Sequence, residues 1–338
     1  MGIAVLGVDL AKNVFQLYGV DSNGRRVVTR RLPRAQLLPF IATIPPCIIG
    51  IEACASAFHW ARQFQARGHT VRIISPQFVK PFIRGNKNDG NDAEAICEAV
   101  QRPNMRFVPL KSVEQQDVQS LHRARQRLVN HRTALISQMR GLLLDRGIVF
   151  AQSATQARRR IPLIVNDPTT DLSPVVRDIL RTLLDLLREL DARIKVFDQE
   201  IARVFHASPV CQRLARIEGV GPKTATAIVA AVGDGREFKN GRHLAAWLGL
   251  VPRHRASGDR ITIGHISKRG DQHLRTLLVH GARAVVRTAG HKTDAKSQWV
   301  MTLVARRGVT RAIVALANKN ARVIWALLAR GDDYRRAA

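Results

Sequence analysis

Two aspartates three residues apart are the first positions in this chain whose types and spacing could do chemistry. Asp89 and Asp92 open the segment 89–98, whose Ala, Glu and Ile content is typical of a helix. Residues at this spacing share one helical face. Taken alone, the pair is typical of N-terminal caps, which stabilise a helix by about 0.5–2 kcal/mol. A catalytic role requires further acids to converge on them.

Two more carboxylates end predicted strands in the preceding segment. Asp9 follows the first strand-like run, and Glu52 ends the first run that reads as a buried strand. Strands are expected at 3–8, 14–20, 25–31, 47–51 and 70–75, and helices at 37–43, 58–67 and from Asp92. The first three strands predict an antiparallel meander, and the whole order predicts an α/β domain with an RNase H-like fold. Sites usually form at strand ends in such sheets.

That fold would bring all four acids to one edge of the sheet. Singly, Asp9 is typical of a turn, and Glu52 of a strand end facing water. Together, four carboxylates without matching bases would repel one another, and their pKa values would rise unless cations bound. Hard oxygen ligands suit Mg²⁺, and two such ions about 3.5–4 Å apart can clamp a phosphoryl transfer. We therefore predict a Mg²⁺ site at Asp9, Glu52, Asp89 and Asp92.

The charge balance indicates a polyanionic partner. The 338 residues include 54 Lys+Arg against 26 Asp+Glu, a net charge of +28. Nucleic acid is the commonest such partner, and a merely solvated basic surface is the alternative. The four cysteines lack metal-ligand spacing, which disfavours a zinc site or disulfide framework. Without a signal-peptide pattern or a run of 18 apolar residues, a cytoplasmic protein that does not bind membranes is expected.

The middle of the chain is predicted to be a helical arm. Residues 111–146 and 174–205 each carry an apolar stripe at helical spacing, and the first is rich in arginine on its polar face. Two long helices with a shorter connection suggest either an antiparallel pair within the chain or a coiled coil used for dimerisation. The stripe keeps no strict heptad, so both alternatives stay open.

The last third is predicted to be mainly helical. Residues 214–230 read as a helix, a Gly-Val-Gly turn and a second helix, which resembles the helix-hairpin-helix DNA-binding motif; a plain helical turn is the alternative. In that motif the turn's backbone N–H groups meet a phosphate, and Lys223 could add charge. Around the turn at Ser257, Arg253, Arg255 and Arg260 interrupt short extended segments. Further helices are expected at 242–250, 272–287, 298–306 and 310–330, before a frayed tail.

These motifs, in this order, resemble the insertion sequence 110/1111 family of DEDD transposases, which act as RNA-guided recombinases. The segments Gly-Val-Asp9, Gly-Ile-Glu52-Ala and Asn-Asp89-Gly-Asn-Asp92-Ala resemble its RuvC-like domain. Ile-Glu-Gly-Val-Gly-Pro-Lys-Thr-Ala, Leu-Gly-Leu-Val-Pro-Arg and Ile-Ser-Lys-Arg-Gly-Asp resemble its C-terminal transposase domain. The resemblance covers nearly the whole chain. It implies an RuvC-like domain at 1–105, a helical coiled-coil arm at 106–208, a transposase domain at 209–331 and a tail at 332–338.

The resemblance also implies a mechanism. The four acids would bind Mg²⁺, and a serine would attack DNA to form a covalent phosphoserine link. That serine is Ser257 here; Ser267 is a weaker candidate, more typical of a helix N-cap. The family combines the acids of one subunit with the serine of another, so at least a dimer is implied. Nucleic-acid-binding positions would be Lys223, Arg253, Arg255, Arg260, Lys268 and Arg269.

The implied partners are the ends of a mobile element, its target DNA and a structured non-coding guide RNA. A cytoplasmic, nucleoid-associated prokaryotic protein is expected. Two alternatives remain open. A Mg²⁺-dependent, structure-specific endonuclease of the RuvC type would need only the four acids. A non-catalytic DNA-binding protein would need only the basic surfaces.

Overall fold

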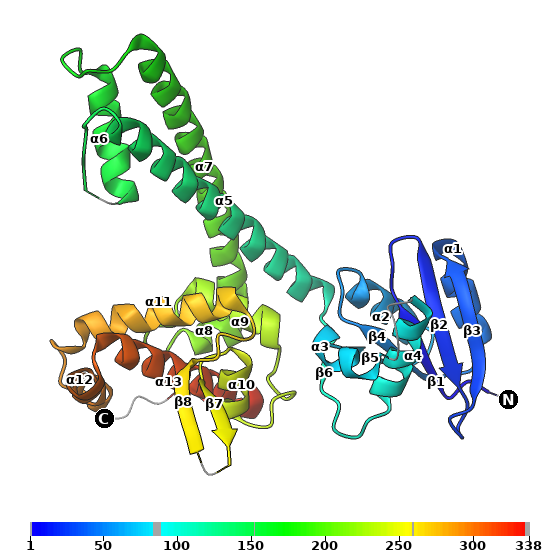
Figure 1. The fold of residues 1–338 in the computed structure, drawn as a ribbon. Helices are drawn as coiled ribbons and strands as arrows, with labels where there is room; N and C mark the ends of the chain where they lie inside the picture. Colours follow the sequence, from blue (N-terminus) through cyan, green and yellow to red (C-terminus); the bar gives the residue numbers. More distant parts are fainter. Residues whose placement is uncertain (1, 84–88, 152, 259, 335–338) are drawn as a thin grey trace. The chain divides into compact units, whose positions relative to one another are not determined.

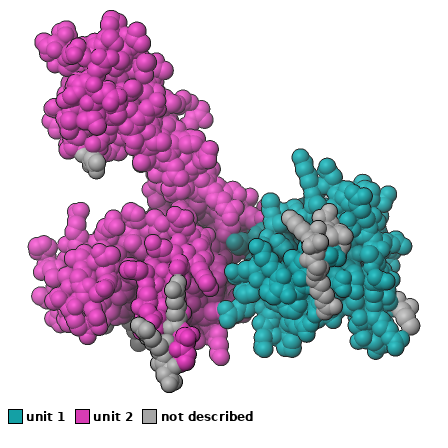
Figure 2. All heavy atoms as spheres, in the orientation of Figure 1, with its two compact units in different colours: residues 1–112 teal, residues 113–338 magenta. Residues whose placement is uncertain are grey.

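The computed structural model describes residues 2–83, 89–151, 153–258 and 260–334, with only the backbone at positions 89, 90, 255, 260 and 261. The chain forms two compact units, residues 1–112 and residues 113–338 (Figure 2). The finer division into four segments, with bounds at 105, 208 and 331, stays a prediction.

The first unit is built on a six-stranded mixed sheet (Figure 1). Its strands are β1 (Val5–Asp9), β2 (Val14–Val20), β3 (Arg26–Pro33), β4 (Ile48–Glu52), β5 (Thr70–Ile74) and β6 (Phe107–Val108), in the order β3-β2-β1-β4-β5-β6. The first three form an antiparallel meander, as predicted. Strand β4 runs parallel to β1 and to β5, whereas β6 is antiparallel to β5. This α/β domain is consistent with the predicted RNase H-like fold.

Helices cover both faces of this sheet because its strands are apolar on both sides. On one face lie α1 (Arg34–Thr43) and α2 (Ala57–Gln65), and their apolar side chains share a core cluster with Leu6 and Val8 of β1. On the other face lie α3 (Pro76–Val79), the 3₁₀ helix η1 (Lys80–Phe82) and α4 (Asp89–Val100). Successive side chains of a strand alternate between faces, so Gly7 and Asp9 belong to the α4 side.

The second unit begins with the helical arm, which consists of α5 (Val113–Leu144), α6 (Ala154–Asn166) and α7 (Pro174–Ala207). Helices α5 and α7 run side by side, and α6 packs against both (Figure 1). Apolar side chains from all three helices and the connecting segments form one cluster, with leucines from α5 and α7 and Ile161, Ile164 and Val165 from α6. The arm's arginines are extensively paired with acids: Arg125–Asp198, Arg132–Asp191, Arg158–Asp191, Arg181–Asp178, Arg188–Asp185, Arg193–Glu189 and Arg203–Glu200. An intermolecular coiled coil stays a prediction.

The rest of the second unit is helical apart from one hairpin. It contains α8 (Pro209–Leu214), α9 (Pro222–Val232), α10 (Gly241–Trp247), β7 (Pro252–Ser257), β8 (Arg260–Ile266), α11 (Gln272–Ala289), α12 (Ala295–Arg307) and α13 (Val309–Arg330). The helices share one apolar core, and β7 and β8 pair antiparallel. The three helices predicted after residue 271 are all present.

Helix α13 is the central helix of that core. Among the described helices it alone is long and apolar enough to cross a membrane by length and composition. Half of that apolar window is buried within the unit, with Leu316, Ala317 and Ile324 fully buried. A buried core helix passes the same test of length and composition, so this observation carries no membrane assignment.

Candidate active site

The position of α4 on the sheet depends on two glycines. Gly7 of β1 and Gly50 of β4 are direct partners in the parallel strand pair. A Cβ atom at Gly7 would lie 2.2 Å from the backbone oxygen of Ala93, and one at Gly50 would lie 3.0 Å from Cβ of Val100. At Gly7 only glycine allows this close approach of helix and strand, and at Gly50 a side chain would be tightly packed against α4. The sequence therefore places α4 directly against the middle of the sheet.

The alternation of side chains along β1 and β4 places the predicted strand-end acids on the same side of the sheet. Asp9 lies two residues after Gly7, and Glu52 lies two residues after Gly50, so both belong to the α4 side of the sheet. Asp92 precedes Ala93, the α4 residue that meets Gly7. These three acids therefore lie at one sheet edge, at the N-terminal end of α4.

The electrostatics of Glu52 report this convergence. Its pKa is raised above the ordinary carboxyl value, mainly by burial and then by the negative charge of Asp92. The ammonium of Lys80, in η1, acts in the opposite direction. Charge repulsion between two half-buried carboxylates is relieved by a bound cation or by protonation. Lys80 was not singled out from the sequence, because a lone lysine 28 residues after Glu52 carries no motif.

The donor set suits a divalent cation but is incomplete among the described side chains. Carboxylate oxygens are hard ligands of the type that Mg²⁺ prefers. Within the described part of the chain, no group of three or more Asp, Glu, His or Cys side chains is gathered closely enough to hold a metal ion. Asp89 is the first residue of α4, one turn before Asp92, but its side chain lies outside the described residues. A four-acid metal site at Asp9, Glu52, Asp89 and Asp92 therefore stays a prediction.

Ser257 lies in the second unit, at the tip of the β7–β8 hairpin. It is the last residue of β7, is exposed, and pairs in register with Arg260. Gly258 follows with a left-handed φ of 55°, as the tight turn requires. The serine thus lies exposed at the end of a two-stranded hairpin. The side chains of Arg255 and Arg260 lie outside the described residues.

The Lys268-Arg269 loop is held by backbone contacts. A Cβ at Gly249 would lie 2.1 Å from the Arg269 oxygen, and one at Gly270 would lie 1.8 Å from the Trp247 oxygen. Lys268 itself has a left-handed φ of 53°, unusual for a residue with a side chain. These contacts fix the loop against the end of α10.

Ser267 is not a helix N-cap, contrary to expectation. Its backbone N–H donates to Val251, beside the hairpin. Helix α11 begins at Gln272, and Asp271 caps it by accepting a hydrogen bond from the Leu274 N–H at 3.0 Å. The helix thus begins at the predicted Gln272, but it is capped by Asp271 and not by Ser267.

Lys223 is partly neutralised. At the start of α9 its ammonium lies 2.8 Å from a carboxylate oxygen of Asp198, which also accepts a hydrogen bond from Arg125 at 2.6 Å. The preceding turn uses Gly219 for packing, since its backbone meets Gly281 of α11. A helix-hairpin-helix function of this turn stays a prediction.

Comparison with known proteins decides the family. The model described as "Transposase IS116/IS110/IS902 family" matches residues 211–298, and a DEDD transposase model of the IS110 group matches residues 6–146. A Pseudomonas aeruginosa protein named "Probable family 20 transposase" is 49% identical over 337 residues, 99% of each chain. The transposase of insertion sequence element IS1111A from Coxiella burnetii is 48% identical, over 98% of this chain and 92% of its own. The transposase of element IS1328 from Yersinia enterocolitica is 37% identical, over 98% of both.

The chain belongs to the IS116/IS110/IS902 family of transposases. The match to residues 6–146 contains Asp9, Glu52, Asp89 and Asp92, and the match to residues 211–298 contains Ser257. The resemblance predicted from the sequence motifs is therefore confirmed. Transposases of this family act on DNA, with cleavage and transfer of strands as their general activity.

Proposed function

We propose that this transposase cuts and rejoins DNA through a serine–phosphodiester intermediate, with Mg²⁺ held by Asp9, Glu52, Asp89 and Asp92. The observation that carries the proposal is the paired approach of Gly7 and Gly50 to α4, which puts Asp9 and Glu52 on the side of the sheet where α4 begins with Asp92 nearby. The raised pKa of Glu52, due first to burial and then to Asp92, supports a cation at this edge.

In the proposed reaction Ser257 is the nucleophile. Its Oγ forms a bond to a phosphorus atom while a bond from that phosphorus to a strand oxygen breaks, and the departing oxygen takes up a proton. A strand hydroxyl then attacks the same phosphorus, which releases the serine oxygen and restores the Ser257 hydroxyl. A bound divalent cation would supply charge neutralisation and lower the pKa of a hydroxyl. Arg253, whose guanidinium donates to the Ser267 backbone oxygen at 3.2 Å, is anchored at the base of this hairpin.

A structured non-coding RNA is the proposed guide. Residues 201–338, the C-terminal part of the second unit, have a net charge of +17, against +11 for residues 1–200. Basic side chains that contact the phosphate backbone hold a nucleic acid but do not read its sequence. Base pairing with an RNA would therefore supply the sequence specificity. A homo-oligomer, dimer or tetramer, would let the acids of one subunit meet the serine of another.

The deciding experiment is a covalent-adduct assay on labelled element-end DNA. We expect the wild-type protein, with its guide RNA and Mg²⁺, to yield a protein–DNA adduct that survives denaturing electrophoresis. Ser257→Ala should lose the adduct while retaining RNA binding. Ser267→Ala is the matched control and should keep the adduct. Adducts that persist in Ser257→Ala and vanish in Ser267→Ala would transfer the nucleophilic role to Ser267.

Two other functions give different outcomes. A structure-specific endonuclease is favoured by the location of all four acids in the first unit, and it predicts that Ser257→Ala cleaves DNA at the wild-type rate. A non-catalytic DNA-binding protein predicts that Asp9→Ala leaves transposition intact. The recombinase proposal predicts loss of transposition in both variants.

A further inference from the structure

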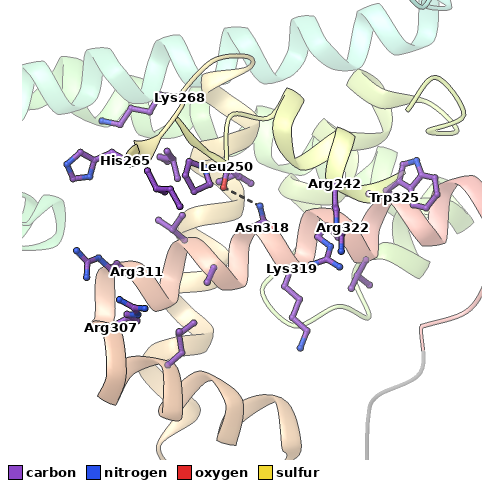
Figure 3. Close-up of a pocket in the computed structure, with 18 of the residues that line it drawn as sticks. Arg242, Leu250, His265, Lys268, Arg307, Arg311, Asn318, Lys319, Arg322 and Trp325 are labelled. Carbon is purple, nitrogen blue, oxygen red and sulfur yellow. Dashed lines mark hydrogen bonds between the residues drawn. The ribbon is translucent and has the colours of Figure 1, made fainter. Parts of the chain in front are cut away.

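A groove in the second unit has the composition of a nucleic-acid-binding surface. Its volume is about 1590 Å³, and its walls come from α10, β8, α12 and α13. None of the described residues that line it is an aspartate or glutamate. Figure 3 shows Arg307 and Arg311 toward one end of the groove, and Arg322 and Trp325 toward the other. We call this surface the α13 groove.

The charge in the α13 groove follows from the two faces of α13. The buried face, which includes Leu316 and Ile324, packs in the core of the unit. Arg311, Lys319, Arg322 and Arg330 line the groove from the other side, and all are exposed. At 100° per residue these four fall within an arc of about 100°, and they extend over about 28 Å of helix. The helix therefore presents a continuous basic stripe.

This stripe differs from the paired cations of the helical arm and of α9. Several arginines of the arm are paired with neighbouring acids, and Lys223 is paired with Asp198. In contrast, the four α13 cations have no ion-pair partner among the described residues, and α13 contains no acid. Uncompensated charge of this kind attracts polyanions. The α13 groove is therefore a place where the net positive charge of the second unit is open to a ligand.

Aromatic side chains in the groove indicate which kind of polyanion it binds. Trp299 of α12 lines the groove and is 36% exposed, and the Lys319 ammonium lies 4.3 Å from its ring centroid. Trp325 also lines the groove, and its indole N–H donates to the Gly235 and Phe238 backbone oxygens at 3.1 and 3.0 Å. Cations beside accessible aromatic rings are the combination that binds single strands, because unpaired bases stack while phosphates meet the charges.

We propose that the α13 groove binds an unpaired stretch of a polynucleotide, with a base stacked on Trp299 and phosphates at Arg311, Lys319 and Arg322. The groove's β8 wall is the base of the hairpin that carries Ser257 at its tip, and Lys268 lines the same wall. A single strand bound in the groove would thus contact the same β7–β8 hairpin that carries Ser257, the proposed nucleophile. The inference deepens the proposed function by locating one of its nucleic-acid contacts.

The test is equilibrium binding of fluorescent oligothymidylate, oligouridylate and a hairpin duplex to the full chain in EDTA. Cleavage plays no part in this assay, so its failure and failure of the serine chemistry are distinguishable. Lys319→Ala with Arg322→Ala should weaken single-strand binding and reduce the slope of log K against log salt by about 1.4, or about 0.7 per lost phosphate contact. Alanine preserves the helix, so α13 should stay folded.

Stacking is tested separately at Trp299. Trp299→Ala should weaken single-strand binding about 5- to 150-fold, the range observed for one stacked base, whereas Trp299→Phe should retain most of it. The charge-matched control is Arg188→Ala with Arg193→Ala, which removes two exposed positive charges from α7. This control should leave the single-strand affinity within about twofold, because surface charges beyond a Debye length of about 10 Å are largely screened.

Each outcome decides the proposal. Preference for oligouridylate over oligothymidylate would assign the groove to RNA, and the reverse would assign it to DNA. One contrary result is an equal loss of affinity for the duplex and for the single strands in the Lys319/Arg322 variant, while Trp299→Ala has no effect. That result would overturn the single-strand assignment in favour of binding to the duplex backbone. Unchanged binding of all three probes by the Lys319/Arg322 variant, with its melting temperature preserved, would remove nucleic acid from the groove.

Discussion

Gly7 and Gly50 are register partners on the adjacent parallel strands β1 and β4, and α4 packs closely against both of them. The acids follow two residues later on each strand. The geometry of the candidate site thus depends on the absence of two side chains as well as on the presence of carboxylates.

Gly7→Ala should therefore disable the site without touching an acid. The new Cβ would lie 2.2 Å from the Ala93 oxygen, so α4 must move or the strand must distort. We expect a loss of about 3 kcal/mol in the free energy of unfolding, at the upper end of overpacking costs, together with loss of transposition. Gly141→Ala is the control. Gly141 has no atom within 4 Å of an added Cβ, so that variant should be about 1 kcal/mol more stable in thermal unfolding. Equal stability of the two variants would contradict the role of Gly7.

The charge of Asp92 should contribute, after burial, to the raised pKa of Glu52. Because burial and Asp92 raise the pKa of folded Glu52, the folded state binds more protons than the unfolded state, and stability falls as pH rises through that window. In EDTA at neutral pH, Asp92→Asn should raise the melting temperature by about 1–3 °C. It should also abolish the gain in melting temperature caused by added Mg²⁺.

Carboxyl NMR titration gives a second readout of the same coupling. Asp92→Asn should lower the pKa of Glu52, and Lys80→Gln should raise it, because Lys80 favours the ionised form. Glu94→Gln removes a charge from the same helix and should leave Glu52 unchanged. A Glu52 titration that moves with Glu94 but not with Asp92 would refute the proposed convergence.

A buried histidine should make the second unit acid-sensitive. Burial, with the positive charges of His273, Arg125 and Lys223, lowers the pKa of His122 from 6.5 to about 4, and its Nε2 lies 3.0 Å from the Thr226 hydroxyl. The unfolded state therefore binds the proton first, so stability is full above pH 6.5 and falls by about 3 kcal/mol as pH drops toward 4. Chemical denaturation at several pH values should show this loss, and His122→Gln should reduce it. A pH-independent unfolding free energy between 4 and 6.5 would exclude the effect.

Asp198 should restrain Lys223. Burial alone would raise the pKa of Asp198, but hydrogen bonds from Arg125 and Lys223 outweigh it, so the carboxylate is ionised and holds both cations. If Lys223 contacts phosphate, Asp198→Asn should tighten nonspecific DNA binding several-fold at low salt, at a stability cost of about 1 kcal/mol for a half-exposed ion pair. Filter binding across a salt series measures the first effect. Asp185→Asn, at an exposed pair on the same helix, should not tighten binding.

The succession of strands and helices around the acids was accessible from the sequence because the elements have their own periodicity and because Asp9 and Glu52 each end a strand. The short strand β6 was not, since two residues carry no pattern. Helix α6 was also missed, because Pro162 and three successive arginines hide its apolar face, although Ala157 and Ile161 are fully buried.

The groove shows a deeper limit of sequence patterns. Periodicity in 310–330 marked the buried residues of α13, such as Leu316 and Leu327, but its exposed cations acquire meaning only beside Trp299 and the β8 wall. Those partners are separated along the chain and meet only through packing. For the same reason the sequence did not show that Gly7 makes room for α4, because this depends on the packing of Ala93 against β1.

Helix α13 contributes one face to the core and another to the α13 groove. A mutation that shifts one face therefore shifts the other as well. Inserting or deleting one residue within α13 would rotate every following side chain by about 100° and bring cations such as Arg322 toward the apolar interior. Core packing thus fixes which positions of α13 face the groove. Relatives that diverge freely in their loops should still keep the length of this helix between Arg311 and Arg330.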